Sequence, residues 1–316
     1  MSWIERLFGS VSKVPPKSLA EIRRVALPRH GRGIISIPEL DFVGQHCASS
    51  NRRYTLLWAD RYWLEGSLVQ GRYMLVDSDR LVTQGRMERP QDGKVADDGT
   101  FILNDWGAST ELVGTFCAFS AEGSPILSRR FSANLLNNGL SRDGKIAVAQ
   151  TCNAPGSTDS SILTVFDLVR KAELGSWTPE SGWASGYEFP AGGDRVRMVR
   201  HDRPSLDYGL LGEFIDRRLW LKDEVRRGTL YVIRKALAEG EEATGLSMDA
   251  LREGVAVALA LDDDRFRADE WRLLGETEES AGRVAQALIA YDEALALNPK
   301  VGVAKRAAAL RKLRDR

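Results

Sequence analysis

Seven residues near the C-terminus have the spacing of a tightly packed pair of helices, and this spacing constrains the fold more than any other feature of the sequence. They are Trp271, Leu274, Gly275, Ala287, Tyr291, Ala294 and Pro299. Small residues let two helices approach closely, the aromatic residues fill the space between them, and a proline ends the second helix. The spacing therefore predicts a compact pair of helices from about residue 270 onward.

This set resembles the tetratricopeptide (TPR) repeat, whose pattern W-x2-L-G, A-x3-Y/F, A, P it matches within about 34 residues. Residues 258–263 echo residues 294–299, so we expect an imperfect repeat before the clear one. Its first helix is expected to include residues 231–239 and its second to begin after a Ser247 cap. Residues 303–313 are expected to form the terminal capping helix, which gives such an array a polar outer face.

The TPR resemblance implies peptide binding along the concave face, which the first helix of each pair lines. It places Asp269, Arg272, Glu276, Glu279 and Ser280 on that face. The family's clamp for a C-terminal carboxylate uses Lys and Asn, so we do not expect recognition of chaperone tails. The short helical tail is equally suited to packing against the rest of the chain or to self-association with another copy.

Residues 33–219 carry short alternating or apolar runs separated by Gly, Asp, Asn and Ser, a pattern typical of antiparallel strands. One turn-plus-strand unit recurs at residues 49–57, 97–103, 141–148 and 191–198. A four-strand unit repeated about every 40–50 residues is typical of a propeller blade, because one blade cannot bury both of its faces alone.

Residues 140–148 and 163–168 resemble blades of the WD40-like and YVTN-like β-propeller families. We therefore expect a multidomain α+β chain with a helical leader (residues 1–32), a β-propeller-like domain of four to five blades (33–219) and an all-α TPR-like domain (220–316). Residues 34–40 are candidates to complete a fifth blade. A β-sandwich with irregular hairpins is the alternative.

Charge and cysteine content limit the partners and the compartment. The 44 basic and 44 acidic residues cancel, so no direct affinity for nucleic acid is expected. Cys47, Cys117 and Cys152 form neither a disulfide framework nor a zinc motif, which indicates a reducing cytoplasm. The type of adaptor that we expect is prokaryotic. No apolar run approaches about 18 residues, so no membrane span is expected.

Motifs for catalysis are incomplete. Residues 139–145 have the spacing of a phosphate-binding loop, but Ile146 stands where a magnesium-binding hydroxyl is needed, and the segment is predicted to be a hairpin. The three histidines form no metal-ligand arrangement. We therefore expect no catalytic residue, no metal and no cofactor.

If the recurring turns lie at one end of the blades, the ends of the strands that follow them share the opposite face. These ends differ from blade to blade, which suggests an individually specified binding face. The candidate binding residues there and on the helical groove are Asp60, Asp105, Trp106, Gln150, Trp183, Arg200, His201, Arg272, Glu276 and Glu279. Tryptophans at such positions are equally suited to capping gaps between blades.

The predicted function is that of a non-catalytic adaptor or scaffold with one or more protein partners. The alternative is a carbohydrate-directed enzyme or lectin that uses Asp60, Asp105, Asp202 and the tryptophans, as in five-bladed sugar hydrolases. A third hypothesis is a subunit that supports a nucleic-acid enzyme through Arg and Lys patches.

The incomplete phosphate-binding loop generates a test. Purified protein should not release phosphate from ATP, because the hydroxyl ligand and the helix N-terminus of that loop are missing. Steady-state phosphate release is the measurement, with Lys145→Ala as the control. Turnover that disappears in Lys145→Ala would restore nucleotide binding to this loop.

Overall fold

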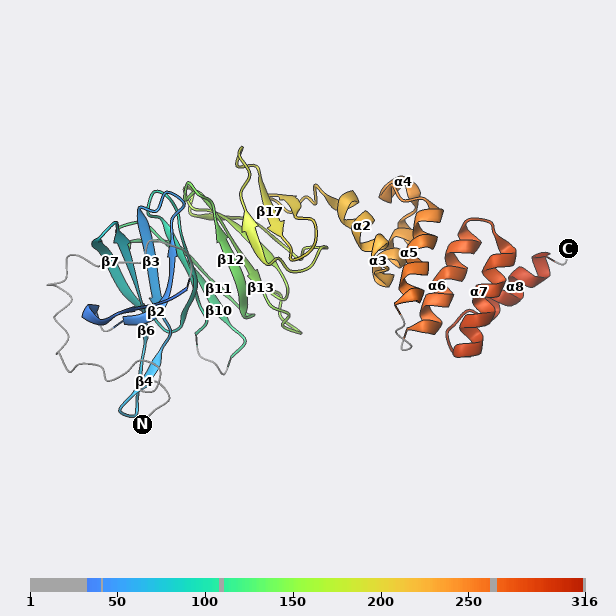
Figure 1. Cartoon of the computed structure of the whole chain (residues 1–316), viewed down its shortest axis with the longest axis horizontal. Helices are drawn as coiled ribbons and strands as arrows, with labels where there is room; N and C mark the ends of the chain where they lie inside the picture. The colour runs from blue at the N-terminus through green and yellow to red at the C-terminus, as the bar shows by residue number, and fades with distance from the viewer. Residues whose placement is uncertain (1–32, 41, 108–110, 262–265, 315–316) are drawn as a thin grey trace. The chain divides into compact units, whose positions relative to one another are not determined.

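The computed structural model of the chain describes residues 33–40, 42–107, 111–261 and 266–314. The expected helical leader over residues 1–32 lies outside the described residues. The chain divides into two compact units (Figure 1). The β unit contains the residues up to His201 together with Asp207–Glu213, and the helical unit contains Asp202–Leu206 and everything from Phe214 onward.

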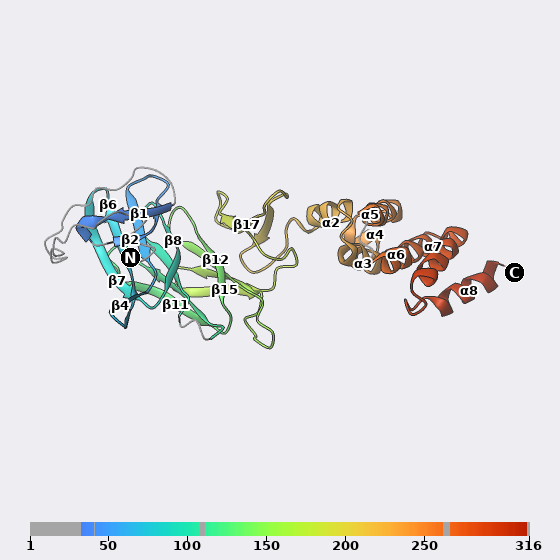
Figure 2. The same ribbon diagram turned by 60° about the horizontal axis from the view of Figure 1, so that its bottom comes forward.

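The β unit is built from successive antiparallel sheets, which Figures 1 and 2 show from two directions. The first sheet has the order β1-β2-β3-β6-β7, with bounds Gly33–Ile37, Phe42–Ala48, Tyr54–Ala59, Gly71–Asp77 and Arg80–Met87. The second has the order β11-β10-β9-β8, with bounds Pro125–Phe131, Gly114–Phe119, Phe101–Asp105 and Pro90–Val95.

The third sheet has the order β12-β13-β14-β15, with bounds Leu135–Leu140, Ile146–Thr151, Leu163–Asp167 and Ala172–Trp177. The fourth has the order β16-β17-β18, with bounds Gly186–Glu188, Arg195–Val199 and Leu206–Gly209. A separate hairpin pairs β4 (Tyr62–Leu64) with β5 (Ser67–Val69).

The middle strands carry apolar side chains that point alternately to the two faces of a sheet, so the sheets pack face to face. In β9, Phe101 and Leu103 belong to a core shared with the first sheet, while Ile102 belongs to a core shared with the third sheet. Successive side chains of a strand point to opposite faces, so a strand that is apolar on both faces requires a neighbour on each side. Phe116 and Phe166 stack across the second interface with ring centroids 4.6 Å apart.

The recurring turns precede β3, β9, β13 and β17, one in each of the four main sheets, and three of them are bonded to one another. The Asn51 backbone N–H donates to Asp97 Oδ1 at 2.6 Å, and the Asp97 backbone N–H donates to the carbonyl of Arg142 at 2.9 Å. Arg142 also forms an ion pair with the Asp97 carboxylate. Gly99 and Gly144 have φ values of +90° and +71°, which explains why these turns use glycine.

Two features differ from the expectations from sequence. Strand β1 is the edge strand of the first sheet, because its five residues pair with β2, so residues 34–40 do not start a fifth sheet. Helix α2 begins at Arg217, three residues before the expected domain boundary, because Trp220 and Leu221 already belong to the helical core. The described strands form a β-rich body of stacked sheets, and closure of these sheets into a propeller ring is not shown.

Seven described helices follow the last strand and make up most of the helical unit. They are α2 (Arg217–Arg226), α3 (Leu230–Glu239), α4 (Glu241–Thr244), α5 (Met248–Ala260), α6 (Arg267–Ser280), α7 (Val284–Leu297) and α8 (Ala304–Arg314). The Ala250 backbone N–H donates to Ser247 Oγ at 3.2 Å, so Ser247 caps α5 as the sequence predicted.

The closest packing of the unit lies between α6 and α7. A Cβ atom placed on Gly275 would lie 2.4 Å from the ring of Tyr291, so only glycine accommodates this contact. Ala287, Tyr291 and Ala294 are fully buried. The C-terminal region is thus helical and closely packed, while its membership of the TPR family stays a prediction.

The crossing of α6 and α7 yields a stability test. Ala287→Arg should lower the free energy of unfolding by about 2–4 kcal/mol, because a long charged side chain would replace a fully buried methyl group. Ala285→Arg on the exposed side of the same helix is the control and should change stability by less than about 0.5 kcal/mol. Urea unfolding followed by far-ultraviolet circular dichroism makes the comparison, and equal midpoints for the two variants would refute the packing argument.

Candidate binding face at the strand ends of the β unit

The strand-end face is formed by the last residues of β3, β9, β13 and β17, the residues that follow them, and the loop at residues 180–185. The structure places six predicted site residues in two groups on this face. The first group joins Asp60, Asp105 and Trp106 through Arg89, and the second joins Gln150, Trp183 and Arg200 through the loop at residues 180–185.

The Asp105 carboxylate holds the connection between the first and second sheets. It accepts backbone N–H bonds from Glu88 at 3.1 Å, Arg89 at 2.8 Å and Gly107 at 3.0 Å. Three donors from the main chain occupy most of the acceptor capacity of a carboxylate. Asp105 therefore acts as a structural acceptor that fixes the chain before β8 and after β9.

Asp60 accepts hydrogen bonds from two side chains, that of Arg89 just before β8 and that of Gln91 in β8. Arg89 Nη2 lies 3.4 Å and Gln91 Nε2 lies 3.0 Å from Asp60 Oδ2. The Arg89 guanidinium also lies over the Trp106 ring, with 5.7 Å between its central carbon and the ring centroid. Trp106 is 37% exposed, so one part of its ring stays open beside this cation.

These contacts do not favour acid–base catalysis by the strand-end carboxylates. A general acid or base must be free to exchange a proton with substrate, and Asp60 and Asp105 are instead bonded to donors of their own chain. Asp202, the third carboxylate of the carbohydrate hypothesis, belongs to the helical unit. Burial and the charge of Asp105 raise the pKa of the Cys117 thiol to about 12, so this thiol stays protonated at neutral pH.

A set of amide side chains holds the loop that carries Trp183. The fully buried Gln150 receives the Ala184 backbone N–H on Oε1 at 2.9 Å and donates from Nε2 to the carbonyl of Gly182 at 3.2 Å. Asn137 Nδ2 donates to the carbonyl of Ala184 at 2.7 Å. Both neighbours of Trp183 are therefore fixed by side chains of the third sheet, while the Trp183 side chain itself is 52% exposed.

Tyr187 completes this amide clamp, by which we mean Asn137, Gln150 and Tyr187 around the loop. Its hydroxyl lies 2.8 Å from Gln150 Oε1 and 3.0 Å from Asn137 Oδ1. Burial, and to a lesser extent the charge of Asp92, hold the pKa of Tyr187 well above its usual value. The hydroxyl therefore keeps its proton and stays a donor across the physiological pH range.

The base of the loop is held from the fourth sheet. Tyr208 Oη donates to Ser181 Oγ at 3.0 Å and accepts the Ser181 backbone N–H at 3.2 Å. Burial raises the pKa of Tyr208, while Ser181 and the positive charge of Arg200 act in the opposite direction. The Ser185 backbone N–H donates to the carbonyl of Val199 at 2.8 Å, so Arg200 follows the residue that holds the end of the loop. His201 lies on an exposed turn at the end of the β unit.

Sequence reasoning did not single out the β4–β5 hairpin. Trp63 is 72% exposed there, and Tyr62, Leu64 and Leu68 are also exposed. The sequence did contain a signal for this exposed hairpin, because three consecutive apolar residues precede the Glu65-Gly66 turn. An isolated two-stranded hairpin has no buried face that could cover all three side chains. The hairpin also borders a small cavity of about 220 Å³ beside Asp60 and Arg89.

On the helical unit, the predicted groove residues have partners within the chain. Arg272 Nε lies 2.9 Å from Glu276 Oε1, and its Nη1 donates to the carbonyl of Val301 at 3.0 Å. Glu279 accepts the Tyr291 hydroxyl at 2.6 Å and forms an ion pair with Arg306 of α8. These charges therefore also tie α6 to α7, to α8 and to the turn before α8.

Among the described residues, no group of three or more His, Cys, Asp or Glu side chains is arranged to hold a metal ion. The three cysteines are free thiols. Over the same ranges, every helix is too short or too polar to cross a bilayer.

No protein-family model matches the chain, and no curated protein matches it significantly. Among solved structures, the chain is similar to the crystal structure of the C-terminal WD40 domain of Sif2, at 7% sequence identity and a TM-score of 0.34. The match covers 50% of this chain and 42% of that chain, so it spans less than half of the solved domain. A TM-score of this size does not establish a common fold.

The amide clamp can be tested by hydrogen exchange. Gln150→Ala should speed exchange of the Ala184 amide by at least about tenfold, because this N–H loses its only described acceptor. Exchange is measured by mass spectrometry on a peptide covering residues 181–185. Gln84→Ala, at an exposed position of β7, is the control. Unchanged protection of Ala184 in the Gln150 variant would show that other contacts hold the loop.

Proposed function

We propose that the protein is a non-catalytic adaptor that binds a protein partner at the strand-end face of its β unit, with Trp183 as the main anchor. The observation that carries this proposal is the amide clamp, which fixes both neighbours of a half-exposed tryptophan. Interface hot spots are enriched in tryptophan. Binding also costs less when the anchor is held in place beforehand, because less conformational freedom is lost on association.

The remainder of the strand-end face supports the same role. Trp106 and Arg89 form a second aromatic–cation pair, and such residues are over-represented at protein interfaces. Arg200 and His201 extend the proposed face toward the end of the fourth sheet. Asp60, Asp105 and Gln150 act within it as positioning residues, since each of them bonds its own chain.

The proposed function includes a specific architecture for each of the two units. The four stacked sheets and their interlocked turns support a propeller-like β unit of four to five blades. The contact between Gly275 and Tyr291 supports a TPR-like pair formed by α6 and α7. On this basis the helical unit offers a second surface around Arg272, Glu276 and Glu279, for a partner or for self-association, in a cytoplasmic protein of prokaryotic type that needs no cofactor.

A lectin function is the second candidate, and the exposed faces of Trp106 and Trp183 are the observation in its favour. Sugars stack on such rings without any acid–base chemistry. The hydrolase form of this hypothesis is not supported, because Asp60 and Asp105 are occupied by donors of the chain.

Removal of the anchor tests the proposed function. Trp183→Ala should reduce the amount of retained partner at least about tenfold, since loss of a buried aromatic anchor costs about 2–4 kcal/mol. The measurement is affinity capture with the full-length protein, followed by quantitative mass spectrometry of the co-purifying chains. Thermal unfolding of the variant confirms that the fold is intact.

Tyr231→Ala is the matched control for this experiment. Tyr231 is more exposed than Trp183, and it lies on α3 of the helical unit rather than on the strand-end face. If Trp183→Ala retains every partner, the strand-end face is not the binding site. If a glycan array shows specific binding that Trp183→Ala removes while no protein is retained, the function is that of a lectin.

A further inference from the structure

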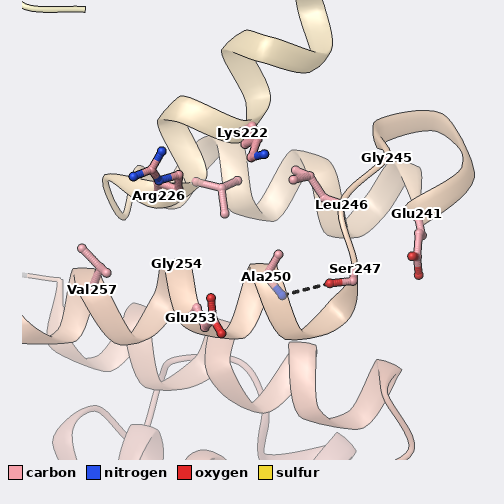
Figure 3. A pocket seen from close by; sticks show the side chains of 11 residues that line it. Lys222, Arg226, Glu241, Gly245, Leu246, Ser247, Ala250, Glu253, Gly254 and Val257 are labelled. Carbon is pink, nitrogen blue, oxygen red and sulfur yellow. Dashed lines mark hydrogen bonds between the residues drawn. The ribbon is translucent and has the colours of Figure 1, made fainter.

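The helical unit carries a groove that the TPR resemblance does not anticipate. Its volume is about 560 Å³, and it is lined by α2, by the segment between α4 and α5, and by α5 (Figure 3). The groove residues expected from sequence lie on α6, so this is a different surface. All of its lining residues belong to the helical unit.

The floor of the groove is apolar and continues beyond the cavity. Val225 and Leu246 form its buried part, and Val257 on α5 is 39% exposed. Leu261 follows Val257 by one helical turn and is 66% exposed. A Cβ on Gly254 would lie 2.6 Å from the carbonyl oxygen of Val225, so α2 and α5 touch at this point and close the bottom of the groove.

The rims of the groove carry opposite charges. Lys222 and Arg226 come from α2, whereas Glu241 and Glu253 come from α4 and α5. All four side chains are exposed, and within the described ranges none of them takes part in an ion pair. Most other cations of this unit are paired, as Arg283 with Glu278 and Arg306 with Glu279 show.

We propose that this groove binds an amphipathic helix of a protein partner, with apolar residues along one face, acidic residues on one flank and basic residues on the other. An open apolar channel between two helices, extended by exposed apolar residues, fits the face of a helix better than a compact ligand. Acidic residues of the partner pair with Lys222 and Arg226, and its basic residues pair with Glu241 and Glu253. This interaction is independent of the Trp183 face.

Three synthetic helical peptides test the charge pattern on the full-length protein. They share one apolar face of leucines and carry glutamates on one flank and lysines on the other (bipolar peptide), lysines on both flanks, or glutamates on both flanks. The bipolar peptide should bind at least about tenfold more tightly than the other two, because each of those meets one rim of like charge. A helix can enter the groove in either direction, and the bipolar peptide takes the one that places its glutamates beside Lys222 and Arg226, so the direction does not have to be known in advance. Fluorescence anisotropy supplies the dissociation constants.

Charge reversal on α2 provides the decisive variant. In Lys222→Glu, Arg226→Glu both rims are acidic, so the all-lysine peptide should become the tightest ligand by at least about tenfold. Lys300→Glu, Lys305→Glu makes the same change in net charge at exposed positions outside the groove and should keep the wild-type order. Val257→Asp should weaken all three peptides, and Trp183→Ala should weaken none.

Equal binding of the three peptides to the wild-type protein, or no binding of any of them, would overturn the proposal. The same holds if the α2 variant keeps the wild-type order. Because Trp183→Ala is included, failure of this groove is distinguishable from failure of the strand-end face.

Discussion

Burial of both faces of the middle strands is the constraint on which the β unit depends. In β3, Leu56 packs into the core shared with the second sheet, whereas Leu57 packs into a core with β1 on the opposite side. A sheet that is apolar on both faces is stable only between two neighbours, so the sheets stack in chain order. The interlocked turns at Asn51, Asp97 and Arg142 then fix one end of the stack, and the strand ends are left to form the opposite face.

Features that depend on local chemistry were accessible from the sequence, and features that depend on distant packing were not. The glycine turns were predictable because Gly99 and Gly144 require a positive φ, and the α6–α7 pair was predictable because Gly275 must leave room for Tyr291. The role of Gln150 was not, since its bonded partners lie more than 30 residues away along the chain. A propensity argument has no access to such contacts.

The polar residues at the strand ends illustrate why chemical diversity alone is a weak sign of a binding site. Long connections between sheets contain backbone N–H and carbonyl groups that need partners when they are covered. Asp105 satisfies three such donors, and Gln150 satisfies one donor and one carbonyl. Each connection has its own geometry, so each requires a different polar residue. The diversity that suggested a functional rim from sequence is therefore largely explained by the loops, and what remains for recognition is the aromatic residue that these contacts present.

The two proposed surfaces make different demands on a partner. Trp183 projects from a backbone that is already fixed, so its partner must offer a preformed pocket, and affinity then depends on how completely the ring is buried. The groove between α2 and α5 has an apolar floor, and its charged rims contribute little in water unless several pairs form together. Selectivity at the groove therefore comes mainly from the rejection of helices with the wrong charge on one flank, whereas selectivity at Trp183 comes from shape. A chain with both surfaces can bind one partner tightly through Trp183 and a second partner more weakly through the charged groove.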